Sequence, residues 1–190
     1  MNDADWPLFG RDHCIATELQ LRDLSVPTTT EVHRLVYEPT WSAPYVITIE
    51  CTGEAASVTA RQSDGVGGYF SGVVVNAGTR ALSSREWARF NKSINADWFR
   101  KLPLDDHKEY LDGHSYIFES RSRDSYHKVI RTCPEDVRFA RFRKVNRLIQ
   151  HFHRLSPIPI SNACYHWQKD KRQARIDWHQ RLGVPDQEAS

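Results

Sequence analysis

Turn-forming residues divide the first half of the chain into short runs of strand-forming residues. The turn signals are Thr52-Gly53-Glu54, Asp64-Gly65 and Asn76-Ala77-Gly78. The strand-forming runs around and before them are 17–24, 32–37, 45–51, 56–62 and 73–75. Turns at such short spacing predict hairpins. They leave no room for a helix between successive strands, so the pattern predicts an antiparallel meander and argues against a doubly wound parallel fold.

Two later segments carry helix signals. Ser83 and Glu86 form a predicted capping box, in which each group satisfies a free amide of the first turn. Thr132 and Glu135 form a second one, with Pro134 in the first turn. The apolar residues after the two caps fall at helical spacing: Trp87, Phe90 and Ile94, then Phe142, Val145, Leu148, Ile149, Phe152 and Leu155. Two further strands are predicted between the helices, at 115–119 and 126–131.

These elements together predict an α+β fold. We expect a mainly antiparallel meander sheet with two amphipathic helices packed on one of its faces. Residues 1–155 are expected to form a single domain, and 156–190 a C-terminal tail that begins at two prolines. A polar helix is predicted over 162–183. We therefore expect the tail to be helical and docked on the domain.

The composition argues against several classes of protein. No apolar run approaches the roughly 20 residues that span a bilayer, so no membrane partner is expected. The acidic N-terminus lacks the features of a secretory signal, which indicates a cytoplasmic location. The four cysteines show no CxxC spacing and are expected to be free thiols: Cys14, Cys51, Cys133 and Cys164. We therefore predict neither a metal site nor a cofactor.

The charge is unevenly distributed along the chain. Residues 1–120 hold 11 Lys and Arg against 17 Asp and Glu, a net charge of −6, whereas 121–190 hold 15 against 7, a net charge of +8. Folding can bring the two regions together and neutralise them in part. Alternatively, the basic region serves an acidic protein or a nucleic acid. The residues predicted to bind such a partner are Arg138, Arg141, Lys144, Arg147 and Arg154.

Candidate catalytic groups are few. If the protein is an enzyme, its acid and base are expected among Asp105, Asp106, His107, Glu119 and His127. Cys133 at a helix N-terminus, with His127 as a possible partner, is a weaker candidate for a nucleophile. His151 and His153 are two residues apart on a predicted helix, so they point in different directions and cannot share an ion.

One stretch of the chain resembles a group of small uncharacterised bacterial proteins. Their pattern is D-G-x-x-W-x-x-E, then Y-H-x-V-x-R-x-x-P, before an amphipathic helix. It is matched here by 112–119 and 126–134, within a similar region of about 80–155. Tyr116 stands where tryptophan is expected, and Thr132-Cys133 where Trp-Ser is usual. The resemblance implies the α+β arrangement and places no catalytic role on any residue.

Three functions follow as hypotheses. The first is a non-enzymatic bacterial binding protein of the immunity type, which neutralises a partner toxin by covering it; charge complementarity gives such proteins fast and selective association. The second is a small hydrolase or nuclease that uses the Asp, Glu and His groups named above. The third is nucleic-acid binding through the basic region 121–190.

Overall fold

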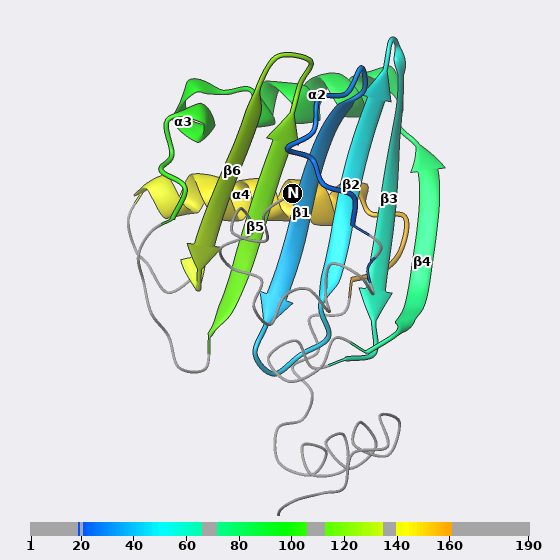
Figure 1. Ribbon diagram of the computed structural model, residues 1–190, viewed down its shortest axis with the longest axis vertical. Coiled ribbons are helices and arrows are strands. Elements are labelled where there is room, and N and C mark those ends of the chain that lie inside the picture. The colour runs from blue at the N-terminus through cyan, green and yellow to red at the C-terminus, as the bar shows by residue number, and fades with distance from the viewer. Residues whose placement is uncertain (1–18, 20, 66–71, 106–112, 135–139, 161–190) are drawn as a thin grey trace, which may run out of the picture.

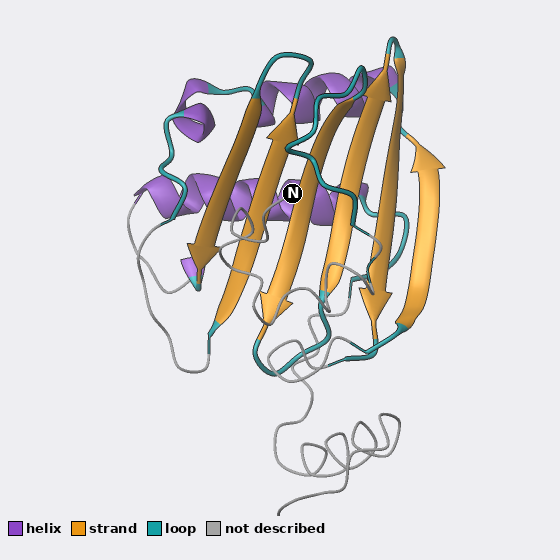
Figure 2. Ribbon diagram, viewed as in Figure 1, coloured by secondary structure: helices purple, strands orange, loops and turns teal. Residues whose placement is uncertain are grey.

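A computed structural model describes residues 19, 21–65, 72–105, 113–134 and 140–160. The strands are β1 (Glu31–Pro39), β2 (Tyr45–Thr52), β3 (Ala55–Ser63), β4 (Val74–Ala81), β5 (His114–Arg121) and β6 (Tyr126–Thr132). The described helices are α2 (Ser84–Ile94), α3 (Asp97–Arg100) and α4 (Ala140–Leu155). The six strands form one antiparallel sheet, and these helices lie behind it on one face (Figures 1 and 2). The predicted α+β class is confirmed.

The strand order is β4-β3-β2-β1-β5-β6. The first four strands are neighbours in sequence as well as in space, which is the predicted meander. Gly53, with a φ of 63°, makes the tight turn between β2 and β3. The segment with α2 and α3 then carries the chain from β4 back across the sheet, so that β5 pairs with β1. This non-sequential pairing places β1 in the interior of the sheet, between β2 and β5.

The predicted turn at 76–78 is wrong, because these residues lie within β4. Gly78 marks a close approach instead of a turn. A Cβ at this position would lie 2.9 Å from Ile158 Cγ2 and 3.4 Å from Pro157, so the chain after α4 packs directly onto the strand backbone. Ile158 belongs to the main core of the protein.

The predicted strand at 17–24 is wrong over its described part beyond Leu19, since residues 21–26 form no strand. Leu19 and residues 21–26, here called the crossing segment, run over the face of the sheet opposite the helices (Figure 1). Leu19 and Leu21 pack there against a small second core of strand side chains. Leu19 and Leu21, two residues apart, are therefore both turned toward the sheet without a strand being formed, and Leu24 is buried as well.

The main core lies between the sheet and the helices. The capping box of α2 is confirmed: Ser83 Oγ accepts from Glu86 N at 3.3 Å, and Ser83 N donates to Glu86 at 2.9 Å. All six residues of the predicted α4 stripe are buried. In the second predicted box, Thr132 is the last residue of β6, and Glu135 lies outside the described residues.

Several predictions fall on parts of the chain that the structure does not describe. They concern the helix at 162–183 and most of the C-terminal tail. None of the helices that the structure does describe is long and apolar enough to cross a membrane.

Candidate functional site

Glu119 lies on the face of the sheet opposite the helices, here called the open face. The crossing segment runs over this face, and the Glu119 carboxylate is buried there in an ion pair. Arg34 Nε donates to Glu119 Oε2 at 2.7 Å, and Tyr126 OH donates to Glu119 Oε1 at 2.6 Å. Burial and the Glu119 carboxylate raise the pKa of Tyr126, so this phenol keeps its proton. Arg131 of β6 takes no part in this ion pair, because it is opposite Tyr116 and points to the helix face.

His127 lies on the other face of the sheet from Glu119. Its Nε2 is 3.0 Å from the carbonyl oxygen of Phe99, and Arg131 donates to the carbonyl of Pro103 at 3.0 Å. Both bonds attach β6 to the segment around α3. Glu119 and His127 therefore do not share a catalytic site. Asp105 is half-buried in the loop after α3, while Asp106 and His107 lie outside the described residues.

The other histidine and cysteine candidates do not form a shared site with one another or with Glu119 and His127. His151 packs edge-on against Phe90, while His153 Nε2 bonds to the hydroxyl of Tyr45, so the two imidazoles are engaged independently, as expected. Cys133 Sγ lies 3.8 Å from His114 Nδ1, and not beside His127. Cys51 and Cys133 are free and buried, as predicted, whereas Cys14 and Cys164 lie outside the described residues. In the described part of the chain, no three His, Cys, Asp or Glu residues gather as a metal site would require.

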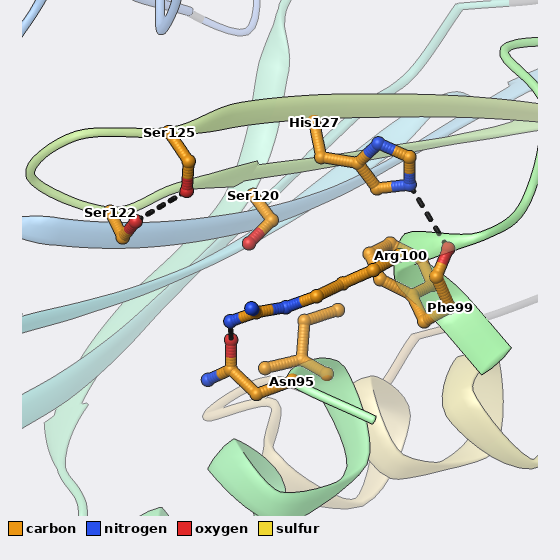
Figure 3. Close-up of a pocket in the computed structure, with 8 residues that line it drawn as sticks. Asn95, Phe99, Arg100, Ser120, Ser122, Ser125 and His127 are labelled. Atoms are coloured by element: carbon orange, nitrogen blue, oxygen red, sulfur yellow. Dashed lines mark hydrogen bonds between the residues drawn. The ribbon is translucent and has the colours of Figure 1, made fainter. Parts of the chain in front are cut away.

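A pocket of about 190 Å³ opens on the helix face between the α2–α3 corner and the β5–β6 hairpin (Figure 3). It is lined by Ile94, Asn95, Phe99, Arg100, Ser120, Ser122, Ser125 and His127. Several of these side chains form hydrogen bonds with one another. Arg100 donates to Asn95 Oδ1 at 2.7 Å, and the Ser122 and Ser125 hydroxyls are 2.6 Å apart. The lining is thus mixed, with polar groups beside the apolar side chains of Ile94 and Phe99, and hydrogen bonds connect part of its wall.

Ser120 connects this pocket to a hydrogen-bonded series inside the protein. Its Oγ lies 2.9 Å from His33 Nδ1, and His33 Nε2 lies 3.0 Å from Glu31 Oε1. Glu31 and His33 are two residues apart on β1, so they point to the same face, and His33 is directly opposite Ser120 on β5. His33 is fully buried against the rings of Trp87 and Phe90. The packing therefore fixes the orientation of the imidazole.

The carboxyl group of Glu31 is held in its charged form. The hydrogen bond with His33 lowers its pKa most, against the opposing effect of burial; the electrostatic effect of His33, a hydrogen bond from Asn95 and the charge of Arg100 lower it further. Glu31 is therefore a carboxylate at neutral pH and accepts the hydrogen bond from His33.

No pattern in the sequence predicted Glu31, His33 or Ser120 as site residues. A separation of 87 residues lies between His33 and Ser120, and no local motif contains both. Only the non-sequential pairing of β1 with β5 brings them together. The one available signal in the sequence was that Glu31 and His33 are two residues apart at the start of a predicted strand. Such a spacing is too common in strands to indicate a site.

The outer side of the helix layer carries a concentration of positive charge. Lys144, Arg147 and Arg154, predicted to bind a partner, are exposed on α4; Arg138 and the side chain of Arg141 lie outside the description. The structure adds four exposed cations to this layer, which the sequence analysis did not include. The described set, here called the basic surface, is Arg85, Arg89 and Lys92 on α2 with Arg143, Lys144, Arg147 and Arg154 on α4.

The two helices contribute to one electrostatic field. Burial lowers the pKa of His151, and the charges of Arg154 on α4 and Arg89 on α2 lower it further. The acidic residue within α2, Glu86, is bonded to Arg80 and to the Ser83 cap, and α4 as described has no Asp or Glu. Within α2 and the described part of α4, no carboxylate other than the engaged Glu86 therefore offsets the cations of the basic surface.

Comparison with known proteins assigns no relative. No protein-family model matches the sequence, and a search of curated proteins finds no match. The function is accordingly argued from the described residues alone.

Proposed function

We propose that the protein binds an acidic surface of another protein through its basic surface. The observation that carries this proposal is the seven exposed cations on α2 and α4; within these two helices as described, the one carboxylate, Glu86, is already bonded to Arg80. In the form that we favour, the protein is a cytoplasmic, immunity-type protein that covers a partner toxin. This function requires no chemical step.

The helix layer suits recognition by charge because it is rigid. Phe90 of α2 and Phe152 of α4 are fully buried and pack edge-to-face with ring centroids 4.9 Å apart. The cations therefore project from a fixed scaffold, and little order has to be gained on binding. A concentrated positive field also accelerates the approach of an acidic partner.

An acidic protein fits this surface better than a single-stranded nucleic acid. Binding of single strands relies on exposed aromatic side chains on which bases stack. Among the described residues, the exposed large hydrophobic side chains are aliphatic: Val26, Val73, Val75 and Leu104. Trp87 and Trp98 are instead packed against the core.

The test compares charge-reversed variants of the full chain as affinity baits in extract of the native host. Arg89→Glu with Arg147→Glu reverses one cation on each helix. Arg123→Glu is the matched control, because Arg123 is an exposed arginine in the β5–β6 loop, outside the basic surface. We expect one stoichiometric protein to be retained by the wild type and the control, lost by the double variant, and released by raised salt.

Two results would contradict the proposal. One is a partner that the double variant retains as well as the wild type does. The other is retention of nucleic acid in place of a protein, with affinity for an oligonucleotide that falls steeply with salt concentration. Circular dichroism of both variants checks that each is folded.

A further inference from the structure

The hydrogen-bonded series from Ser120 to Glu31 has the composition of an activated nucleophile. It joins a hydroxyl, an imidazole and a carboxylate in that order, with separations of 2.9 and 3.0 Å. Both distances are within the reach that a nucleophile and its base require. We propose that Ser120 is the nucleophile of a site that hydrolyses small carboxylic esters, with His33 as its general base. The site is separate from the basic surface and does not depend on it.

The direction of the hydrogen bonds follows from the charge of Glu31. A carboxylate can only accept a hydrogen bond, so His33 Nε2 carries the proton that points at Glu31. In the neutral imidazole, Nδ1 then has a lone pair and accepts the hydroxyl hydrogen of Ser120. The series is therefore polarised in the sense that a general base needs. Glu31 acts as a positioning residue, which fixes the tautomer and stabilises the imidazolium when it forms.

The pocket supplies the place for the substrate. Figure 3 shows Ser120 pointing into the space beside Arg100 and Asn95. The guanidinium of Arg100 is the charged donor in this lining, and it suits the negative charge that develops on a carbonyl oxygen under attack. A volume of about 190 Å³ favours a short acyl group over a long chain.

The reaction consists of two balanced steps. Ser120 Oγ bonds to the carbonyl carbon of the ester while its proton passes to His33 Nδ1. The bond between that carbon and the alcohol oxygen then breaks, and the leaving oxygen takes the proton from His33. In the second step, water attacks the acyl-serine, with His33 again accepting and returning a proton, and the carboxylic acid leaves. Water is the co-reactant.

The test uses diisopropyl fluorophosphate as a covalent probe and p-nitrophenyl acetate as a substrate, with the full chain. We expect one equivalent of probe to attach to Ser120, as located by peptide mass spectrometry. Ser120→Ala should take up no probe and show no hydrolysis. Ser115→Ala is the matched control, since Ser115 lies on the same strand, points to the opposite face and bonds to Thr132. It should react as the wild type does.

Glu31→Gln tests the hydrogen-bonded series without creating a cavity in the core, because glutamine has nearly the same size and the Glu31 side chain is 27% exposed. Loss of general-base assistance should slow labelling by about 10²-fold or more. Glu31→Asp keeps a carboxylate and should label faster than Glu31→Gln, although its shorter side chain fits the site less well; a purely structural role would not give this order. The proposal is overturned if the folded wild type takes up no probe, if the probe attaches elsewhere, or if Glu31→Gln labels at the wild-type rate.

Discussion

Arg34 and Glu119 form a buried ion pair between β1 and β5, in which Arg34 Nε lies 2.7 Å from Glu119 Oε2. The two side chains are only 2% and 5% exposed. Arg34 Nη1 also donates to the carbonyl oxygen of Arg22 at 2.8 Å, so the same guanidinium holds the crossing segment. This pair joins the non-sequential strands on the open face, opposite the face where His33 meets Ser120.

Replacement of Arg34 alone is expected to destabilise the protein strongly. Arg34→Met leaves the Glu119 carboxylate buried without its ion-pair partner, and such a loss costs about 3–5 kcal/mol. Urea unfolding followed by tryptophan fluorescence measures it. Arg34→Met with Glu119→Leu removes both charges and should recover much of the loss. Arg22→Ala breaks an exposed pair with Glu50 and should cost about 1 kcal/mol or less. Equal losses for Arg34→Met and Arg22→Ala would contradict this account.

Two further arginines hold the crossing segment by its backbone. Arg61 of β3 donates to the carbonyl of Leu19 at 3.2 Å, and Arg121 of β5 donates to the carbonyls of Ser25 and Val26. With Arg34 between them, these bonds follow the segment across the sheet from β3 to β5. The spacing of Leu19 and Leu21 predicted a strand, but in the structure arginine side chains of the sheet, and not a neighbouring strand, bond to the carbonyl groups of this segment.

Patterns among residues close in sequence predicted most of the helices and strands. The position of the candidate site depends instead on the pairing of strands that are distant in sequence. The hairpin around Gly53, the Ser83 cap and the apolar stripe of α4 depend on residues close in sequence, and each was confirmed. The pairing of β1 with β5 depends on a return path through α2 and α3, which no local pattern specifies. Glu119, an ion-pair residue, was therefore predicted as a site residue, whereas Ser120, its neighbour on the other face of the sheet, was not.

Gly78 is expected to tolerate no side chain. Gly78→Ala places a methyl group 2.9 Å from Ile158 Cγ2, so the segment after α4 must shift, at a cost of about 1–3 kcal/mol. The measurement is the urea midpoint of the variant. Ile158→Ala removes the opposing atoms and is destabilising itself, but in the double variant the two losses should sum to less than their separate values. Additive losses would show that the two residues do not meet.

The first turn of α2 depends on its cap. Ser83→Ala removes the hydroxyl that accepts from Glu86 N, and the expected loss of stability is about 1 kcal/mol. Ser84→Ala is the matched control, because Ser84 is the exposed first residue of the helix and should change stability little. Thermal unfolding of the two variants side by side distinguishes them. Two equal transition temperatures would show that the cap contributes nothing.

Stability is expected to fall on mild acidification, because partial burial of His153 favours its neutral form. Burial lowers the pKa of His153 below its ordinary value of 6.5, so the unfolded chain takes up this proton at a higher pH than the folded protein does. The unfolded state therefore binds more protons below pH 6.5, and the free energy of unfolding decreases as the pH falls through that range. His153→Gln keeps an acceptor for the Tyr45 hydroxyl and cannot titrate. Urea unfolding at a series of pH values should give a shallower decrease for this variant, and parallel curves would contradict the assignment.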